Sequence, residues 1–342
     1  MDWDQLNVNL LDRLRARFLG QTPDTGNYWR GWDDLEHYDF VFARRIGWKW
    51  DAVLADLKRL GWTPPPGVLL DWGCGTGVAS RRIMAAFGAD SFREIRLHDR
   101  SGLAMRFAAE AARREAGRVK AAPADPETLR GKKPFGLLAI SHVINELDEQ
   151  QLDDLARLCR RAKSVIWVEP GTHDDSRRLV EVRERLRDEF HVVAPCLHQA
   201  RCEMLLGVNE RHWCHFFAQP PAGVLGDPRW RELARVLRID IRSLPYSCLV
   251  LQHRRVKAEP TADPTGYARF IGRPRVYKPL VKVFSCDESG LEEREAQKRD
   301  APEFYKACKK DEIDTLYSLE LGEGGRIQNL TGWRGDDVAP AS

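Results

Sequence analysis

Residues 68–77 read Val-Leu-Leu-Asp-Trp-Gly-Cys-Gly-Thr-Gly: a short apolar run that ends in an acid and is followed by three alternating glycines. The apolar run predicts a buried strand, and the periodic segment 78–87 predicts a helix directly after the glycines. Glycine permits a sharp turn and a close approach of the backbone to a ligand. A dinucleotide-binding loop needs the spacing G-x-G-x-x-G, whereas here it is G-x-G-x-G and position 78 is Val. The preceding acid, Asp71, suits a cationic ligand better than a pyrophosphate.

The alternation of apolar runs and helices continues to about residue 191. Continuous apolar runs between helices are typical of a parallel sheet that is covered on both faces. The sequence therefore predicts an α/β fold with a Rossmann-like sheet. The expected strands are 68–71, 95–99, 119–122, 135–141 and 164–169, and the expected helices are 78–87, 102–116, 149–161 and 175–189.

Regions of different character flank this sheet. Amphipathic periodicity over 6–18 and 38–60 predicts an N-terminal helical region, which a Pro-Pro-Pro-Gly break ends. After residue 191 the alternation stops, and strand-like pieces at 239–241, 248–252, 281–286 and 315–321 predict a small β-rich region. We expect an N-terminal helical region at 1–62, the Rossmann-like domain at 63–191, a cysteine-rich loop at 192–222, a β-rich region at 223–330 and a polar tail at 331–342.

Composition excludes several classes of protein. The chain of 342 residues is 43% hydrophobic and 31% charged, and it has no apolar stretch long enough to cross a bilayer, so we expect no membrane association. A net charge of +3 argues against a purely electrostatic nucleic-acid binder but allows a local basic face. The acidic start, Met1-Asp2-Trp3-Asp4, resembles neither a secretory signal nor a transit peptide. We expect a monomer in the bacterial cytoplasm, or in the mitochondrial matrix if the protein is organellar.

The glycine segment resembles motif I of the class I S-adenosylmethionine (SAM)-dependent methyltransferases. In that family the loop packs against the amino-acid part of the cofactor, an acid at the end of the second strand binds the ribose, and a further acid contacts the adenine. The resemblance assigns the ribose to Asp99 and the adenine to Asp125, although Asp125 could equally be a turn residue before Pro126. It implies that the cofactor-binding residues are Asp71, Gly73, Gly75, Gly77, Asp99 and Asp125.

The apolar run 135–141, with His142, resembles the fourth-strand motif that faces the methyl group in that family. The segment Ser-His-Val-Ile-Asn-Glu over 141–146 lacks the proline pair that usually accompanies methylation of the adenine amino group. Pro195-Cys196 resembles the nucleophile dipeptide of cytosine C5 methylation, but it lies in the cysteine-rich loop. The candidate catalytic groups are His142, Asn145 and Glu146, and His142 could instead be a satisfied histidine at a strand end.

Cysteines are dense in the loop after residue 191. Three of them lie within nineteen residues, and a fourth thiolate would complete a four-cysteine site. Cys286 is the best fourth candidate because it ends an expected strand beside a turn. The expected metal ligands are therefore Cys196, Cys202, Cys214 and Cys286. Zinc is the competing occupant, because His198, His212 and His215 are at hand.

The whole pattern resembles the methyltransferase-like proteins of the mitochondrial small ribosomal subunit and their bacterial relatives, over roughly residues 30–320. The resemblance is carried by 71–77, 141–147, 168–172, Cys196 with Cys202, the Trp-Cys-His-Phe tetrapeptide at 213–216, 245–250 and 272–275. It implies that the four cysteines hold a [4Fe–4S] cluster and that the protein acts in maturation of the small subunit. This chain departs from the family in having Leu197 and Glu203, where prolines usually follow the first two cysteines, and in a longer gap before Cys214.

A basic segment over 267–282 interleaves cations with aromatic residues and contains no acid. Arginine binds phosphate through its planar guanidinium, and aromatic rings stack on unpaired bases. A basic edge strand is the alternative interpretation. The RNA-binding candidates are Arg269, Arg273, Arg275 and Lys278.

These observations favour a SAM-dependent methyltransferase that acts on the small ribosomal subunit or its ribosomal RNA (rRNA). The alternative is a non-catalytic assembly factor that binds SAM and a metal cluster without methyl transfer. A small-molecule methyltransferase would need neither the cysteine loop nor the basic segment.

Overall fold

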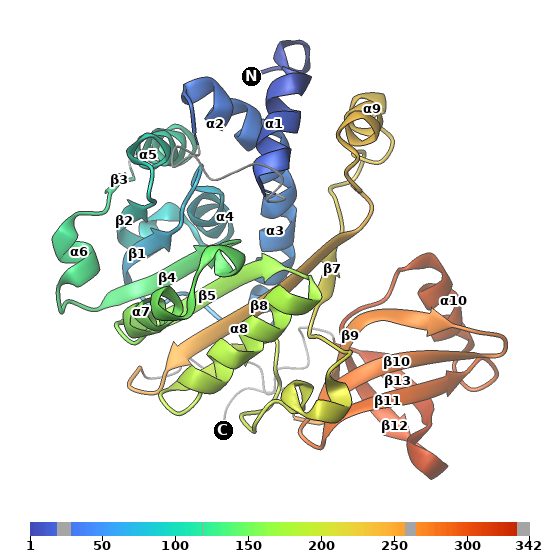
Figure 1. Ribbon diagram of the computed structural model, residues 1–342. Coiled ribbons are helices and arrows are strands. Elements are labelled where there is room, and N and C mark those ends of the chain that lie inside the picture. Colours follow the sequence, from blue (N-terminus) through green and yellow to red (C-terminus); the bar gives the residue numbers. More distant parts are fainter. Residues whose placement is uncertain (19–28, 118, 257–264, 334–342) are drawn as a thin grey trace.

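The computed structural model describes residues 1–18, 29–117, 119–256 and 265–333. It consists of a central sheet with helices on both faces and a small β-barrel beside it (Figure 1). The helices are α1 (Val8–Phe18), α2 (Trp32–Tyr38), α3 (Arg44–Arg59), α4 (Val78–Phe87), α5 (Gly102–Ala116), α6 (Pro126–Arg130), α7 (Glu149–Cys159), α8 (His173–Leu186), α9 (Pro228–Leu237) and α10 (Pro302–Lys310). In these ranges no helix is both long and apolar enough to span a membrane.

The strands form the central sheet and the barrel. Those of the central sheet are β1 (Gly67–Trp72), β2 (Phe92–His98), β3 (Ala121–Pro123), β4 (Phe135–Ser141), β5 (Ala162–Pro170), β6 (Phe190–Ala194), β7 (Phe216–Ala218) and β8 (Leu244–His253). Those of the barrel are β9 (Tyr267–Val276), β10 (Leu280–Asp287), β11 (Gly290–Gln297), β12 (Leu316–Leu321) and β13 (Ile327–Gly332).

The central sheet has the order β3-β2-β1-β4-β5-β8-β6. Strands β1 to β5 pair in parallel, whereas β8 runs antiparallel to both β5 and β6. Strands β4 and β5 are buried on both faces, as their continuous apolar runs predict. This arrangement confirms the expected α/β fold with a Rossmann-like methyltransferase sheet.

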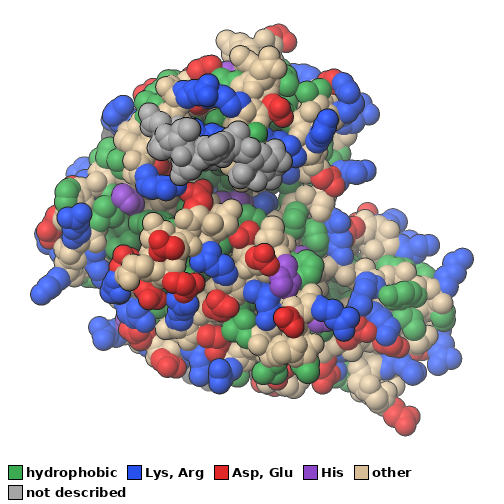
Figure 2. Space-filling model, viewed as in Figure 1, with side chains coloured by type: hydrophobic (Ala, Val, Ile, Leu, Met, Phe, Trp, Pro, Cys, Tyr) green, Lys and Arg blue, Asp and Glu red, His purple; other side chains and the backbone are tan. Residues whose placement is uncertain are grey.

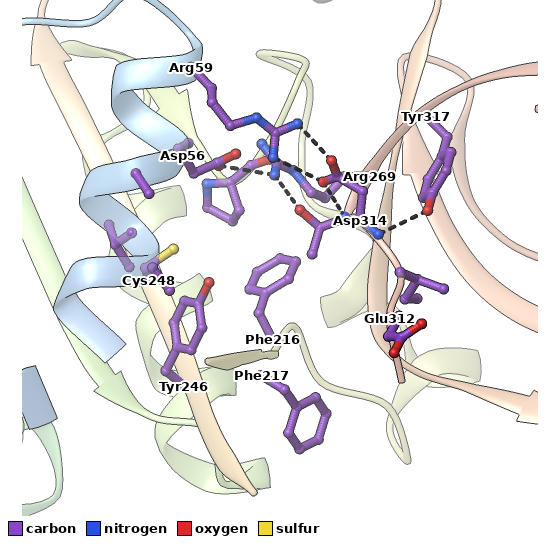
Figure 3. A pocket seen from close by; sticks show the side chains of 17 residues that line it. Asp56, Arg59, Phe216, Phe217, Tyr246, Cys248, Arg269, Glu312, Asp314 and Tyr317 are labelled. Carbon is purple, nitrogen blue, oxygen red and sulfur yellow. Dashed lines mark hydrogen bonds and ion pairs between the residues drawn. The ribbon is translucent and has the colours of Figure 1, made fainter. Parts of the chain in front are cut away.

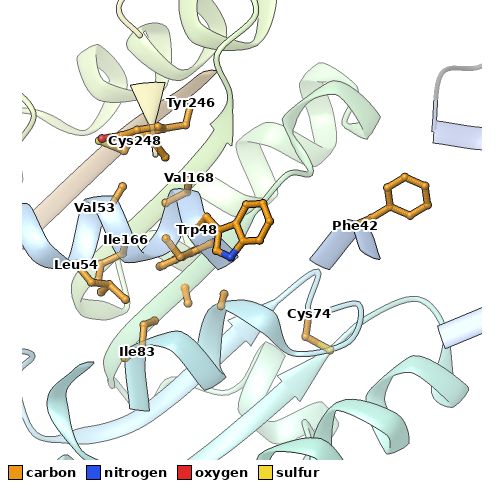
Figure 4. Packing of buried hydrophobic residues seen from close by; sticks show 14 of the residues in the cluster. Phe42, Trp48, Val53, Leu54, Cys74, Ile83, Ile166, Val168, Tyr246 and Cys248 are labelled. Carbon is orange, nitrogen blue, oxygen red and sulfur yellow. The ribbon is translucent and has the colours of Figure 1, made fainter. Parts of the chain in front are cut away.

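The N-terminal helical region packs onto one face of this sheet. Figure 4 shows Trp48, Val53 and Leu54 of α3 beside Ile83 of α4 and Val168 of β5. Each of these side chains is buried, and full burial of a large apolar side chain contributes about 1.5 to 3 kcal/mol. Helix α3 is therefore an integral part of the core and not an appended segment.

The sheet extends beyond the boundary expected at residue 191. Strand β6 ends at Ala194, and β8, which begins fifty residues further along the chain at Leu244, enters the sheet between β5 and β6. Local periodicity does not reveal this insertion, because the pairing partners of β8 are distant in sequence. The strand expected at 239–241 is wrong: these residues belong to the connection between α9 and β8, where Ile241 is buried as an anchor.

The C-terminal β-rich region is confirmed as a closed barrel with the order β10-β11-β13-β12-β9. Helix α10 connects β11 to β12. Numbered along the chain, the five strands follow the order 1-2-3-5-4, with a helix after the third, which is the arrangement of an OB-fold barrel. Of the tail expected at 331–342, the described residues include the end of β13 and Trp333, and the rest lies outside them.

Candidate cofactor and cysteine sites

The three glycines after β1 all adopt left-handed backbone conformations, with φ values of 71°, 50° and 78°. A Cβ atom on Gly73 would lie 2.5 Å from Cγ1 of Val143, and one on Gly77 would lie 2.9 Å from Cβ of Ala108. Both glycines are therefore required by packing. Gly75 differs, because a Cβ atom there would meet no atom within 4 Å. The loop is built around an open position at Gly75, where a ligand could lie against the backbone.

Asp71 lies beneath this loop and is fully buried. Its Oδ2 atom accepts hydrogen bonds from the backbone N–H and the hydroxyl of Ser80, at 3.1 and 2.7 Å, which ties β1 to α4. Its Oδ1 atom and the hydroxyl of Thr76 are buried and have no hydrogen-bond partner among the described residues. Burial raises the pKa of Asp71 to about 7, although the bonds from Ser80 oppose the shift. Two orphaned polar atoms thus lie at the loop.

Asp99 follows β2 and lies against the glycine loop. Its Oδ2 atom accepts a hydrogen bond from the backbone N–H of Gly75 at 2.9 Å, and its Oδ1 atom accepts one from Ser101 at 2.8 Å. Tyr38 is close by: its pKa is raised by burial and then by the carboxylates around it, which include Asp99. The end of α2 therefore approaches the edge of the sheet at which β1 and β2 end.

Asp125 is exposed and acts as the N-cap of α6. Its carboxylate accepts hydrogen bonds from the backbone N–H and the hydroxyl of Thr128, both at 2.7 Å, and these bonds lower its pKa. The turn role weighed for Asp125 is thus present in the structure. A contact with adenine stays a prediction.

His142 has a left-handed backbone with a φ of 54°, which is strained for a residue with a side chain. Its Nε2 atom lies 3.2 Å from Nζ of Lys49, and its Nδ1 atom lies 3.3 Å from the hydroxyl of Ser141. That hydroxyl accepts a hydrogen bond from the Trp50 indole N–H at 2.9 Å. Burial, followed by the charge of Lys49, lowers the pKa of His142 well below its ordinary value. His142 therefore favours its neutral form and lies in a half-buried polar cluster with Lys49 and Ser141.

Lys49 is a member of this cluster that sequence reasoning missed. It lies on α3, 93 residues before His142. Burial, followed by the charge of Arg45, lowers the pKa of Lys49 to about 7. A single lysine in an amphipathic helix reads as a solvated residue, so no local signal marked it.

Glu169 holds the turn after β4 in place. Its buried carboxylate accepts hydrogen bonds from the backbone N–H groups of Val143 and Ile144, each at 3.1 Å, and from the Trp167 indole. Burial raises its pKa to about 8 despite these donors. Glu169 thus positions the segment that carries His142.

Asn145 and Glu146 are exposed, in contrast to His142. Glu146 forms an ion pair with Arg100 at 2.9 Å. Of the three catalytic candidates, the structure therefore brings only His142 into the half-buried polar cluster.

The four candidate metal ligands come from two parts of the fold. Three lie in the loop between β6 and β7, and the fourth lies on β10 of the barrel. All four are half-buried free cysteines. Burial raises the pKa of the Cys214 and Cys286 thiols, and in each case the thiols of Cys196 and Cys202 raise it further. The four sulfurs thus share one electrostatic neighbourhood.

Charged residues brace this cysteine loop from both sides. Arg183 of α8 is buried and donates to the carbonyl of Ala200 at 2.8 Å, and its neighbour Glu184 accepts from the backbone N–H of Cys202 at 3.2 Å. On the barrel side, Glu203 accepts a hydrogen bond from the backbone N–H of Leu291 at 2.8 Å. The loop is therefore fixed to both the central domain and the barrel.

The cysteine set does not have the geometry of a single-ion site. In the described ranges, no group of three or more His, Cys, Asp or Glu side chains converges closely enough to hold one metal ion. His198 approaches the set, with its Nε2 atom 3.5 Å from Sγ of Cys286 and its buried Nδ1 atom without a partner in the described chain. A tetrahedral zinc ion needs its sulfurs about 2.3 Å from one centre.

Arg269 requires a correction. We expected it to contact RNA, but its side chain is buried, with only 3% of the residue exposed. Its Nη1 atom lies 3.0 Å from Asp56 on α3, and its Nε atom donates to the carbonyl of Pro195 at 3.1 Å. Arg269 is thus a structural link between the barrel and the central domain, because its pairing with Asp56 uses the charge that RNA would need.

The other three RNA candidates are exposed. Arg273 pairs with Asp311 at 3.1 Å, and Arg275 pairs with Glu293. Lys278 lies in the turn after β9. The barrel supplies acids from other segments that the linear sequence of 267–282 does not reveal.

A cleft of about 590 Å³ separates α3 from the barrel (Figure 3). Phe216, Phe217 and Tyr246 contribute aromatic rings to its lining, and Arg59 bridges it to Asp314 through hydrogen bonds of 3.0 and 2.9 Å. No residue of the glycine loop lines this cleft. It is a junction between domains, separate from the candidate cofactor site.

One protein family accounts for most of the chain. Its sequence model, described as mitochondrial small ribosomal subunit Rsm22, matches residues 42–316. The chain belongs to the Rsm22 family. The family resemblance expected from the sequence is thereby confirmed, and with it a methyltransferase-like protein linked to the small ribosomal subunit. A search of curated proteins finds no match.

Solved structures similar to this Rsm22-family chain include several methyltransferases. A magnesium protoporphyrin IX methyltransferase from Synechocystis PCC 6803 with bound SAM is 12% identical, with a TM-score of 0.38, and the match covers 74% of this chain and 98% of that one. A provisionally assigned RNA methyltransferase from Pyrococcus horikoshii is 11% identical, with a TM-score of 0.35 and coverages of 62% and 84%. A SAM-dependent methyltransferase from Aquifex aeolicus is 12% identical, with a TM-score of 0.36 and coverages of 48% and 90%.

Proposed function

We propose that this Rsm22-family protein binds SAM at its glycine loop and methylates RNA of the small ribosomal subunit. The observation that carries the proposal is the open position at Gly75, which adjoins the Asp99 carboxylate and lies in the loop above the orphaned Oδ1 atom of Asp71. Such a role would place the protein in the mitochondrial matrix or in the bacterial cytoplasm.

The chain's own residues have distinct tasks in this proposal. Asp71 and Asp99 offer carboxylate oxygens to the cationic amino acid and to the ribose hydroxyls of SAM. Bound SAM would supply an electrophilic methyl group. An acceptor that carries a proton needs a base, and His142 is held neutral beside Lys49. Glu169 keeps this pair in position through the backbone of the turn after β4.

The four cysteines would hold a [4Fe–4S] cluster. Thiolates are the usual ligands of such clusters, and the thiols of Cys196 and Cys202 are near enough to those of Cys214 and Cys286 to raise the pKa of both. The cluster would stabilise the loop, because binding free energy becomes folding free energy when the site is not otherwise formed. Metal analysis of the anaerobically purified protein should find about four iron atoms per chain, and stoichiometric zinc would contradict the proposal.

A second candidate is a non-catalytic assembly factor that binds SAM and the cluster. The exposed positions of Asn145 and Glu146 favour it, because they leave His142 as the only one of our catalytic candidates in the half-buried polar cluster. His142 is itself hydrogen-bonded to Lys49 and Ser141.

The test measures SAM binding by calorimetry and methyl transfer from labelled SAM to purified small subunits. We expect both in the wild-type protein, and we expect Asp99→Ala to lose at least about tenfold in SAM affinity, because a charge-assisted hydrogen bond contributes about 1.5 to 3 kcal/mol. Asp90→Ala, a change at an exposed acid next to β2, is the matched control. SAM binding without transfer to RNA or protein would select the assembly factor, and absence of SAM binding would overturn both.

A further inference from the structure

The register of the barrel brings three loops to one rim. Val276, Val281, Ala296, Ile327 and Leu321 are successive Cα partners across β9, β10, β11, β13 and β12. Each of these residues lies at or next to an end of its strand. The turns 277–279, 298–301 and 322–326 must therefore lie together. We call these three turns, with the strand ends Val276 and Leu321, the loop rim.

Hydrogen bonds support this arrangement of the loop rim. The backbone N–H of Lys298 donates to the carbonyl of Pro279 at 2.8 Å, which links two of the turns directly. The Tyr305 hydroxyl on α10 donates to the carbonyl of Tyr277 at 2.9 Å. The third turn is closed by a bond from Gly322 to the carbonyl of Arg326 at 2.8 Å. In Figure 1 the turn between β9 and β10 faces away from the central sheet.

The loop rim combines exposed cations with exposed apolar side chains. Tyr277 is 49% exposed and Leu321 is 45% exposed. The turns carry four exposed cations against two exposed acids, Asp300 and Glu323. Arg299 pairs with Asp300 at 3.4 Å, whereas no ion pair in the described ranges involves the other three cations. The exposed cations are Lys278, Lys298, Arg299 and Arg326.

The outer surface of the neighbouring strands is different. Lys282 of β10 lies 3.0 Å from Glu293 and 2.9 Å from Glu295 of β11, and Arg275 of β9 also pairs with Glu293. The basic segment expected from the sequence is thus largely neutralised along the strands. Positive charge without a carboxylate partner occurs at the loop rim, and Figure 2 shows Lys and Arg side chains along the edge of the molecule where the barrel lies.

We propose that the loop rim binds single-stranded RNA. Its cations would contact phosphates, and Tyr277 would stack on an unpaired base, which is how proteins bind single strands without reading a duplex groove. The loops of OB-fold barrels bind oligonucleotides in this way. The inference rests on the proposed function only for the source of the RNA, the small ribosomal subunit.

The experiment measures fluorescence anisotropy of labelled oligouridine of twelve nucleotides, with a hairpin duplex as the competing probe. We expect the wild-type protein to bind the single strand more tightly. Tyr277→Ala should weaken binding at least fivefold, because stacking contributes about 1 to 3 kcal/mol per base, and Tyr277→Phe should retain it. The slope of log K against log[salt] should become less steep by about 1.4 in the double variant Lys298→Gln/Arg326→Gln, because two phosphate contacts are lost.

The matched control is Lys282→Gln, which removes a cation that carboxylates already neutralise. It should change affinity less than twofold. Two results with the variants would overturn the proposal: equal losses of affinity for Lys282→Gln and the rim variants, or wild-type affinity in both rim variants. The proposal would also fail if the wild-type protein did not bind the single strand or preferred the duplex. Circular dichroism and SAM affinity of every variant identify any that fail to fold. In that case Lys298→Gln alone decides the question, because it should lower the slope of log K against log[salt] by about 0.7.

Cosedimentation with isolated small subunits separates this inference from the proposed function. If wild-type protein and rim variants sediment equally with the subunit, the loop rim is not the RNA contact and the ribosomal role stands. If the protein does not sediment with the subunit, yet binding of the single strand depends on the rim, the ribosomal role fails and the inference stands.

Discussion

The glycine loop and the cysteine loop, our two proposed binding sites, differ in how the chain forms them. The glycine loop consists of consecutive residues whose left-handed φ values and close packing against Val143 and Ala108 set its shape without any ligand. The proposed cysteine site combines a long connection with a strand of the barrel, so its four cysteines would meet only after the two domains have docked.

The difference concerns where the conformational entropy is lost. In the glycine loop, short-range geometry fixes the backbone at little cost, because glycine tolerates positive φ. In the cysteine loop, ordering the chain costs roughly 1 to 2 kcal/mol per residue, and three bracing contacts from Arg183, Glu184 and Glu203 offset only part of it. We therefore expect the first site to survive damage that destroys the second.

Loss of a cysteine ligand should have the largest effect. Cys214→Ala removes one of the four thiolates, and we expect bound iron and its visible absorbance to fall to background. SAM affinity should stay within about twofold of wild type, because the glycine loop keeps its hydrogen bonds. Loss of even one of those bonds would lower the affinity by more than about twofold. The control is Cys159→Ala, at a buried cysteine of α7, which should retain its iron. Iron analysis and calorimetry check the pair, and an iron-free protein that has also lost SAM binding would show that the two sites are not independent.

Breaking the link between the domains should come next. Arg269→Ala leaves Asp56 of α3 without its partner at a site that is largely buried, and removal of one partner from a buried pair costs about 3 to 5 kcal/mol. Denaturant unfolding measures the loss. Arg275→Ala, at an exposed pair on the same strand, should change the free energy of unfolding by less than about 1 kcal/mol. Equal effects of the two substitutions would mean that the barrel does not depend on Arg269.

The same difference explains what the sequence could predict. Residues 71–77 and the apolar run of β4 specify their structure locally, and both were predicted. The insertion of β8 between β5 and β6 was not, because antiparallel pairing across such a separation leaves no periodic signal. Arg269 looked like a phosphate ligand, because its partner Asp56 lies on α3, over two hundred residues away. Lys49 was missed for the same reason: its partner His142 follows a distant strand.

A pH dependence should follow from Glu169. Burial raises its pKa from 4.5 to about 8, so the folded protein holds this proton more tightly than the unfolded chain does. The stabilisation is fully present below about pH 4.5 and is lost as the pH rises through 8. Other groups titrate in the same range, so the quantity to measure is the difference in free energy of unfolding between wild type and Glu169→Gln. That difference should shift against the wild type between pH 5 and pH 8, and a constant difference would mean that Glu169 is ionised throughout.

The smallest expected effect comes from Ser101, and it tests whether the proposed SAM site depends on a side chain outside the glycine loop. Ser101 caps α5, and its hydroxyl accepts a hydrogen bond from the backbone N–H of Ala104 at 3.3 Å. Its own backbone N–H donates to Asp99 at 2.8 Å. Ser101→Ala removes the cap and keeps the bond to Asp99, so we expect a loss of about 1 kcal/mol in the free energy of unfolding and unchanged SAM affinity.

Ser101→Gly separates the cap from the site, because glycine is tolerated at this position and should cost only about a few tenths of a kcal/mol. Denaturant unfolding and calorimetry on the same samples give both quantities. If Ser101→Ala instead weakens SAM binding about tenfold, the Ser101 hydroxyl contacts the ligand, and the site is not made by the glycine loop and its two carboxylates alone. If only the free energy of unfolding changes, the backbone hydrogen bond to Asp99 is sufficient for SAM binding. The proposed cofactor site would then depend on local backbone geometry, whereas the proposed cysteine site depends on docking of the barrel.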